Sequence, residues 1–331
     1  MPAGREDNVI FGRKQRVDAP ANDAPVEADR TARSPLTTNP RMVAITADPG
    51  TRPRDDELDL CGLTHRGKVR PDNQDHYLIC TVHPQVVVHG TSLGKIDHLP
   101  LRGTRMATLM MVADGVGGGA GGAEASQLAI ETVAKYVSST LRCYHAAGSS
   151  DDREFHAALR AAALEAHQAV LTEAARRPAQ GKMATTMTMG VAVWPNLYVV
   201  QVGDSRCYHY YDGVLRRLTR DQTMAQDLVD RGVLPPERAA QSPLSNVLVG
   251  AIGGDDASPE VCSLRIPRGT VLLFCSDGLT KHVTDDEIAE GIRTMRSSEQ
   301  VCRQLLDLAL DRGGTDNITV VVARAPIRRD D

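Results

Sequence analysis

The sequence predicts an α+β domain in which antiparallel β-strands form layers that helices cover. Two observations predict this class. Most strand-like runs follow one another through short turns of Gly, Pro, Asn and Asp, as antiparallel strands do. Two long stretches carry apolar residues at helical spacing, and the regular alternation of single strands and helices that a Rossmann-like sheet needs is absent.

The first part of the predicted domain consists mainly of strands. Strands are expected over residues 58–64 and 75–81, separated by a turn at Gly67. An inserted hairpin is expected between residues 85 and 101. A continuous apolar run over residues 106–113 then predicts a buried strand.

The middle of the chain begins with two helical patterns. Residues 125–137 and 155–170 carry apolar or small side chains three or four positions apart, which predicts two helices that each bury one face. Pro178 and Gly181 end the second. Three strands joined by short turns follow, and we expect them to be antiparallel neighbours. They cover residues 185–193, 197–202 and 207–211.

The last third mixes helices and strands. A short helix over residues 224–231 precedes a Pro- and Gly-rich stretch at 234–256, which predicts an irregular surface segment or flap. The remaining predicted elements are strands over 261–266 and 270–275, helices over 285–295 and 298–310, and a final strand over 318–325.

Composition argues against several classes of protein. The 331 residues carry a net charge of −4, which argues against a protein that binds nucleic acid by broad phosphate neutralisation. Only 3% are aromatic, too few for a base-stacking surface. No apolar run is long enough to span a membrane, and no secretory signal is recognisable. Seven scattered cysteines without a CxxC pair are typical of reduced thiols in the cytoplasm.

The N-terminal residues differ from the rest of the chain. Residues 1–56 have balanced charge, one aromatic residue and no periodicity, so they cannot bury enough apolar surface to offset their ordering entropy. We expect a disordered tail there, with a docking peptide around residues 9–11 as the alternative. A single domain is expected over residues 57–326, followed by a short tail at 327–331.

Five aspartates lie at predicted strand ends, where side chains from different strands can converge. They are Asp75, Asp114, Asp204, Asp277 and Asp316. Each one alone is typical of a turn. Together they form an oxygen-rich set of the kind that Mg²⁺ or Mn²⁺ binds, and a glycine after the carboxylate leaves its carbonyl free to bind as well. The set predicts a two-metal hydrolytic site at which an activated water attacks phosphorus.

The run DGVGGGAGG precedes a predicted helix and therefore also has a nucleotide-binding interpretation. It lacks the lysine of the GxxxxGK[ST] motif and the acidic residue of the Rossmann pattern. We therefore expect its glycines to let the chain pass close beneath the metal cluster before the helix begins.

Seven short motifs occur in the order seen in metal-dependent protein serine/threonine phosphatases of the type 2C (PPM) class. They are RGKVRPDNQD, ADGVGGGAGG, ATTMTMGV, VGDSR, LTRDQT, FCSDGL and GGTDNITVVV. The chain resembles the bacterial branch of this family over about residues 58–325. The resemblance implies a four-layer αββα sandwich, with two antiparallel sheets flanked by helix pairs. It also implies two Mn²⁺ or Mg²⁺ ions in a cleft at one end, with a third bound more weakly.

The motifs also imply roles for individual residues. By position, Asp114 resembles a bridging ligand that is also catalytic, and the Gly115 carbonyl resembles a further ligand. The ligands of the first ion are expected to be Asp277 and Asp316. A direct or outer-sphere metal carboxylate with a catalytic role is expected at Asp75. The weaker third ion is expected to use Asp204.

The motifs contain a phosphate-binding candidate and two departures from the family pattern. Arg70 resembles the catalytic arginine that holds the substrate phosphate, which a bidentate guanidinium suits. Residues 185–186 and 205–206 are expected to be structural.

Gln74 stands where a glutamate is common, which predicts weaker metal affinity. Val116 stands where eukaryotic members have a histidine proposed as general acid, so the proton donor stays open, with metal-bound water as the candidate.

The resemblance implies an active, cytoplasmic, monomeric phosphatase that hydrolyses phosphoserine and phosphothreonine in proteins. Its expected partners are serine/threonine kinases and their targets, with neither nucleic acid nor a membrane. One alternative is a catalytically weak or inactive member of the fold that acts as a binding or regulatory module. Another is an enzyme for small phosphate esters. Intact aspartates favour the active enzyme, and specificity is expected to depend on the rim segments 82–105 and 234–256.

Overall fold

A computed structural model describes most of the chain after residue 48. The described residues are 49–85, 87–89, 91–92, 101–117, 120–147, 152–178 and 182–327, without the side chains of 142–147. All of them belong to one compact unit, residues 44–331. Most of the expected tail at 1–56, much of the expected inserted hairpin and the last four residues therefore lie outside the described part.

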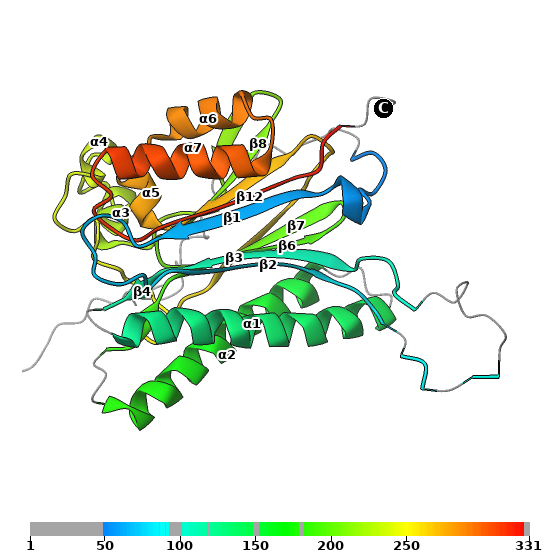
Figure 1. The fold of residues 1–331 in the computed structure, drawn as a ribbon. Helices are drawn as coiled ribbons and strands as arrows, with labels where there is room; N and C mark the ends of the chain where they lie inside the picture. The colour runs from blue at the N-terminus through cyan, green and yellow to red at the C-terminus, as the bar shows by residue number, and fades with distance from the viewer. Residues whose placement is uncertain are drawn as a thin grey trace, which may run out of the picture. The chain divides into compact units, whose positions relative to one another are not determined.

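Two antiparallel five-stranded sheets form the centre of this unit (Figure 1). The first sheet consists, in spatial order, of β1 (Asp59–His65), β12 (Ile318–Arg324), β11 (Val271–Cys275), β8 (Arg206–Tyr211) and β9 (Val214–Arg217). The second consists of β10 (Glu260–Arg265), β7 (Asn196–Val202), β6 (Met187–Val193), β3 (Ala107–Ala113) and β2 (His76–Val82). Two short strands, β4 (Gly115–Val116) and β5 (Ala184–Thr185), pair beside them.

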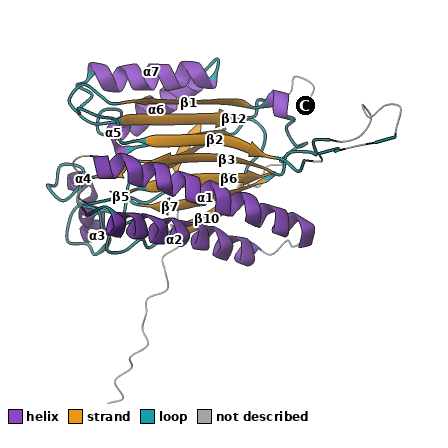
Figure 2. Ribbon diagram, turned by 60° about the horizontal axis from the view of Figure 1, so that its bottom comes forward, coloured by secondary structure: helices purple, strands orange, loops and turns teal. Residues whose placement is uncertain are grey.

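Helix pairs cover the outer faces of the two sheets (Figure 2). The second sheet packs against α1 (Ala120–Ala147) and α2 (Asp152–Arg176), and the first against α6 (Asp285–Arg293) and α7 (Ser298–Asp311). The short helices are η1 (Asp55–Glu57), α3 (Met224–Asp230), α4 (Pro236–Ala239) and α5 (Asp277–Thr280). The predicted αββα sandwich is confirmed. Across the described residues, no helix has the length and apolar character needed to cross a bilayer.

Three apolar layers explain why the elements stack in this order. Between the sheets, side chains such as Met110, Leu197 and Phe274 are almost completely buried. Separate apolar clusters fill the spaces between each sheet and its helices. Strands β3 and β11 therefore bury both faces and read as continuous apolar runs, as expected for β3 from residues 106–113.

The expected pairing of neighbouring strands is wrong at one place. Strands β6 and β7 pair as predicted, but β7 and β8 lie in different sheets. Both edges of β7 are already occupied by β6 and β10, so the chain crosses to the other sheet, where β8 pairs with β11. Gly203 permits this crossing because its φ of +96° favours glycine. Short elements were also missed, among them β9, α4 and α5, because four residues are too few to show a period.

Contacts with the folded domain extend to residues before the expected domain boundary at residue 57. Arg105 is buried and donates hydrogen bonds to the Pro53 carbonyl (2.7 Å) and to Asp55 Oδ1 (2.6 Å). Arg268 is also buried and donates to the Thr51 carbonyl (2.9 Å). Two buried arginines thus bind residues 51–55 to the folded domain. The polar composition of this segment did not predict these contacts.

The buried histidine of strand β8 predicts a pH dependence of stability. His209 is 1% exposed, and within the described part of the chain neither ring nitrogen has a hydrogen-bond partner. Burial, with a smaller effect of Arg216, lowers its pKa to about 4, below the unfolded value of about 6.5. The stability that neutral His209 permits is therefore complete above pH 6.5 and is lost as the pH falls towards 4.

We expect His209→Leu to remove this loss. Between pH 7.5 and 4.5 the wild type should lose about 2 to 3 kcal/mol more unfolding free energy than the variant. Urea denaturation at both pH values measures the difference. Parallel losses in the two proteins would show that folding does not lower the pKa of His209.

Candidate metal centre

The five expected aspartates meet at one end of the sandwich. Three of them flank strands of the second sheet: Asp75 precedes β2, and Asp114 and Asp204 follow β3 and β7. The other two flank strands of the first sheet, since Asp277 follows β11 and Asp316 precedes β12. Burial raises the pKa of Asp114 well above its usual value, and the charges of the other four aspartates raise it further. Each of the other four aspartates therefore lies within electrostatic range of Asp114.

Asp75 is held in a fixed orientation by two hydroxyl groups. Ser276 and Thr319 both donate to its Oδ2 atom at 2.7 Å. Its Oδ1 atom is buried and has no hydrogen-bond partner among the residues that the structure describes. Burial raises the pKa of Asp75 to about 6, and the Asp277 charge contributes to the shift. Asp75 therefore presents one free, desolvated oxygen.

The backbone of Asp114 is fixed by two threonines. Its carbonyl accepts hydrogen bonds from the Thr185 hydroxyl (2.8 Å) and the Thr186 N–H (2.9 Å). Its own N–H donates to the Thr186 hydroxyl (3.1 Å). The Ser205 hydroxyl lies 2.7 Å from that of Thr186. These contacts confirm the structural role expected for Thr185, Thr186 and Ser205.

Two glycines beside the aspartates are required by close approach of the chain. A Cβ on Gly115 would lie 2.4 Å from the Gly122 carbonyl oxygen, and a Cβ on Gly278 would lie 1.9 Å from that of Asn317. Neither position can hold a side chain without moving the backbone. The expectation that the DGVGGGAGG glycines allow close passage is confirmed at Gly115 and Gly122, whereas residues 118–119 lie outside the described residues.

Asn317 connects the motif RGKVRPDNQD with the motif GGTDNITVVV. This role was not predicted from the sequence. Its Oδ1 accepts from the Gln74 N–H (2.8 Å), and its Nδ2 donates to the carbonyls of Arg66 (2.9 Å) and Asp72 (2.8 Å). One amide side chain can serve both donors and acceptors in this way. The only sequence signal was its place directly after Asp316.

Two cationic side chains bind the aspartates of the first sheet. Arg70 contacts both oxygens of Asp316, at 2.8 Å from Nε and 3.0 Å from Nη2. Lys281 Nζ lies 2.6 Å from Asp277 Oδ2 and 2.8 Å from Asp316 Oδ2. Burial opposes ionisation of Asp316, but the hydrogen bonds from Lys281 and Arg70 outweigh it and lower the pKa. Lys281 was missed, although it follows Asp277 by four residues on one helix face.

The remaining candidate positions are placed as follows. Asp204 is 9% exposed, and burial and the Asp277 charge raise its pKa. The side-chain oxygen of Gln74 lies against Gly122 at the start of α1, where a Cβ would come within 2.6 Å of it. Val116 belongs to β4.

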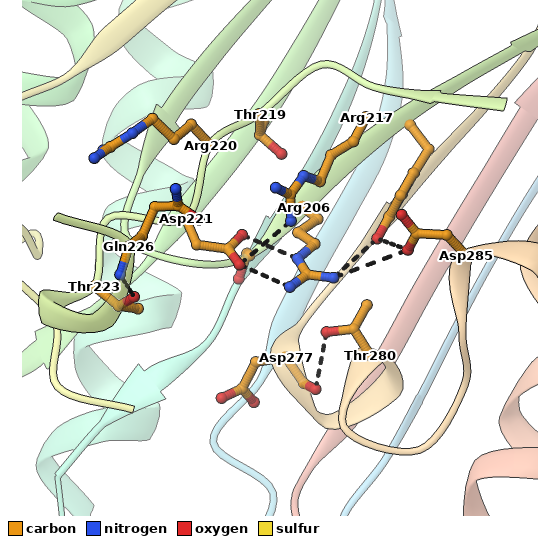
Figure 3. Close-up of polar contacts among 12 residues, drawn as sticks. Arg206, Arg217, Thr219, Arg220, Asp221, Thr223, Gln226, Asp277, Thr280 and Asp285 are labelled. Atoms are coloured by element: carbon orange, nitrogen blue, oxygen red, sulfur yellow. Dashed lines mark hydrogen bonds and ion pairs between the residues drawn. The ribbon is translucent and has the colours of Figure 1, made fainter. Parts of the chain in front are cut away.

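Arg206 forms an ion-pair network beside the site (Figure 3). It donates to both carboxylate oxygens of Asp221, at 2.9 and 2.7 Å, and to the Tyr208 hydroxyl at 3.1 Å. Tyr208 in turn donates to Asp285 at 2.8 Å. In Figure 3 the Asp277 carboxylate points away from Arg206. The role of Arg206 is therefore to join β8 to the loop after β9 and to α6, as expected of a structural residue.

We expect Asp221→Asn to destabilise the protein by about 3 kcal/mol, because it leaves the half-buried Arg206 without its charged partner. Urea denaturation measures the change. Asp227→Asn is the matched control, since its pair with Arg231 is exposed and should contribute about 0.5 kcal/mol or less. Equal effects of the two substitutions would contradict the importance of the Arg206 pair.

The donor set fits divalent cations. Among the described residues, the buried Oδ1 atoms of Asp75 and Asp277 have no hydrogen-bond partner. Burial, together with neighbouring carboxylate charges, raises the pKa values of Asp75, Asp114 and Asp204. Oxygen ligands without paired histidine or cysteine suit Mg²⁺ or Mn²⁺. Within the described residues, no three Asp, Glu, His or Cys side chains are already grouped around one point, and the Lys281 ammonium lies between Asp277 and Asp316.

Comparison with known proteins gives a consistent result. The family model described as Protein phosphatase 2C matches residues 97–312. Serine/threonine protein phosphatase PstP of Mycobacterium tuberculosis is 36% identical over 217 residues, which cover 66% of this chain and 40% of PstP. Serine/threonine phosphatase stp of Listeria monocytogenes is 28% identical over 261 residues, which cover 78% of this chain and 92% of that protein.

A solved structure extends the comparison to the fold. The catalytic domain of PstP in complex with two manganese ions aligns with a TM-score of 0.63 and 29% identity, covering 82% of this chain and 99% of that one. The chain thus spans less than half of the full length of PstP but nearly all of its catalytic domain. The family match covers more than half of the chain and includes three of the five aspartates, Asp114, Asp204 and Asp277. The chain belongs to the protein phosphatase 2C family.

Proposed function

We propose that this protein is a metal-dependent protein serine/threonine phosphatase that hydrolyses phosphoserine and phosphothreonine. The observation that carries the proposal is the convergence of five buried or half-buried aspartates with one arginine at the end of the sandwich. Membership of the protein phosphatase 2C family and the two manganese ions in the PstP structure support it.

The aspartates and one carbonyl are proposed to hold two Mn²⁺ or Mg²⁺ ions. The proposed ligands are Asp75, Asp114, Asp277, Asp316 and the carbonyl of Gly115, with Asp204 available for a weaker third ion. When bound, such ions lower the pKa of water and stabilise negative charge on a phosphate ester. The protein contributes fixed positions: Ser276 and Thr319 orient Asp75, and Asn317 holds the loop that carries Arg70.

Arg70 is proposed to bind the substrate phosphate. Its side chain is 53% exposed, and its guanidinium already contacts both oxygens of a carboxylate, Asp316. A tetrahedral phosphate offers the same pair of acceptors, with a larger negative charge. The guanidinium is therefore positioned at the site where a phosphate ester needs neutralisation and orientation.

One assay separates the active enzyme from its alternatives. Hydrolysis of p-nitrophenyl phosphate and of a phosphothreonine peptide is measured with Mn²⁺ and after EDTA. The proposal expects Mn²⁺-dependent hydrolysis of both substrates. A protein that binds Mn²⁺ but hydrolyses neither is a binding or regulatory module, and hydrolysis of only the small ester indicates an enzyme for small molecules.

We expect Arg70→Ala to raise KM for p-nitrophenyl phosphate by about tenfold, because charged hydrogen bonds to phosphate are lost. The fall in kcat should be smaller. Steady-state kinetics at saturating Mn²⁺ measure both quantities. If the variant instead loses bound Mn²⁺ in equilibrium dialysis, Arg70 acts by positioning Asp316 rather than by binding phosphate.

The proposal also covers the oligomeric state, the cellular location and the partners of the enzyme. A monomeric phosphatase in the cytoplasm would reverse the action of serine/threonine kinases on shared protein targets. The serine/threonine phosphatase names of the bacterial relatives support the proposed reversal of kinase action. Phosphoproteomics of a strain that lacks the gene tests it, with accumulation of phosphothreonine in cytoplasmic proteins as the expected result.

A further inference from the structure

Lys281 occupies a cation position inside the proposed metal centre. Its Nζ atom lies 2.6 Å from Asp277 Oδ2 and 2.8 Å from Asp316 Oδ2, so one ammonium group bridges two carboxylates from different elements. The lysine is 29% exposed, unlike surface pairs such as Arg303–Glu299, in which both partners are more than 60% exposed. The contact is therefore part of the site.

The bridge uses two carboxylates that the proposed function assigns to metal, Asp277 and Asp316. Both Oδ2 atoms face the ammonium, and Asp316 is shared further with Arg70. A divalent ion that binds these oxygens needs the lone pairs to which Lys281 donates. A monovalent and a divalent cation at adjacent positions also repel each other strongly where water is largely excluded. Metal and Lys281 cannot both occupy this position.

The position and the flexibility of Lys281 allow its ammonium group to move away from the two aspartates. It is the residue at which the short helix α5 ends, and its four-carbon side chain is flexible enough to turn towards solvent. The same side chain offsets carboxylate repulsion while no metal is present.

We propose that Lys281 is a tethered cation that holds Asp277 and Asp316 together in the metal-free protein and competes with metal for them. It is a positioning residue that sets the free metal concentration at which the site fills. The inference rests on the proposed function, which makes Asp277 and Asp316 ligands of Mn²⁺ or Mg²⁺.

The test compares Lys281→Met with Lys135→Met, which removes the same charge from an exposed position on α1. Isothermal titration with Mn²⁺, without substrate, measures affinity, and thermal unfolding is recorded in EDTA and in saturating Mn²⁺. We expect Lys281→Met to bind Mn²⁺ about tenfold more tightly and to unfold at a lower temperature in EDTA. Lys135→Met should match the wild type in both measurements.

A purely structural lysine would lower stability without tightening metal binding, so opposite changes of the two quantities identify competition. An unchanged or weaker Mn²⁺ affinity in Lys281→Met overturns the inference. If Lys281→Met does not fold in EDTA, the affinity can be measured in two other ways. Lys281→Gln can be titrated with Mn²⁺, or Lys281→Met can be kept loaded with Mn²⁺ and its affinity determined by competition with a chelator.

The outcomes also separate this inference from the proposed function. Equal Mn²⁺ binding by wild type and Lys281→Met overturns only the role of Lys281. Binding by the variant but not by the wild type supports the role of Lys281. Binding by neither protein overturns both.

Discussion

Asp114→Asn is expected to reduce Mn²⁺-dependent hydrolysis of p-nitrophenyl phosphate by at least about a thousandfold, equivalent to about 4 kcal/mol of transition-state stabilisation. Asp114 is the carboxylate on which the other four aspartates act, so it lies at the centre of the cluster. Asparagine keeps the shape but removes the charge that a hard dication needs. Steady-state kinetics across a range of Mn²⁺ concentrations measure the loss.

The same substitution should stabilise the metal-free protein. Removing one of several neighbouring negative charges relieves repulsion, so the unfolding free energy in EDTA should rise by about 1 kcal/mol. Asp307→Asn, on the exposed face of α7, is the control and should change neither activity nor stability. A folded Asp114→Asn protein with wild-type turnover and wild-type Mn²⁺ affinity would remove Asp114 from the proposed centre.

Mn²⁺ is expected to stabilise the protein, and more so at high pH. At a free concentration of about one hundred times Kd, the ion should add about 2.7 kcal/mol to the unfolding free energy at pH 8. At pH 5 protons compete for the same carboxylates, and the gain should be smaller. Urea denaturation in Mn²⁺ and in EDTA at the two pH values measures this.

The direction of the pH effect follows from the carboxyl groups. Burial raises the pKa of Asp75 to about 6, and it also raises the pKa values of Asp114 and Asp204. A carboxyl group with a raised folded pKa contributes stability that is complete below its unfolded value of about 3.9 and is lost as the pH rises through the folded value. Metal-free stability should therefore fall as the pH rises from about 4 to the folded pKa of Asp75 at about 6.

Bound Mn²⁺ cancels this fall because it replaces the protons as the neutralising charge. His209→Leu is the control, since it removes another group that titrates between pH 4 and 6.5 and should leave the difference between Mn²⁺ and EDTA unchanged. Identical stabilisation by Mn²⁺ at pH 5 and pH 8 would show that the raised carboxyl groups are not the metal ligands.

Much of the fold was predictable because its elements are long and periodic. The two stripes at 125–137 and 155–170 became the cores of α1 and α2, and the apolar run at 106–113 became β3. Assignment of strands to sheets was not predictable in the same way. A short turn such as the one after β7 reads as a hairpin whether the next strand pairs alongside or crosses to the other sheet.

In the candidate site too, local features were predictable and contacts between distant parts of the chain were not. The aspartates could be named because each lies in a motif at a strand end. The residues that hold them could not, because their contacts join distant parts of the chain: Ser276 and Thr319 reach Asp75 across 201 and 244 positions. Lys281 was the exception, since its spacing from Asp277 is local, but a lysine in a helix is usually solvated and gives no reason to place it among ligands.

The placement of the aspartates on two different sheets links ion binding to the alignment of the sandwich. Asp114 comes from the second sheet and Asp277 from the first, so a slip of one sheet over the other by a single residue, about 3.3 Å, would separate them. The contact that resists such a slip lies deep between the sheets: Phe274 packs so closely over Gly190 that a Cβ there would lie 2.4 Å from the ring. Packing in the interior therefore sets the distance between aspartates that come from different sheets. We expect a methyl group added at Gly190 to change ion affinity although it contacts no ligand.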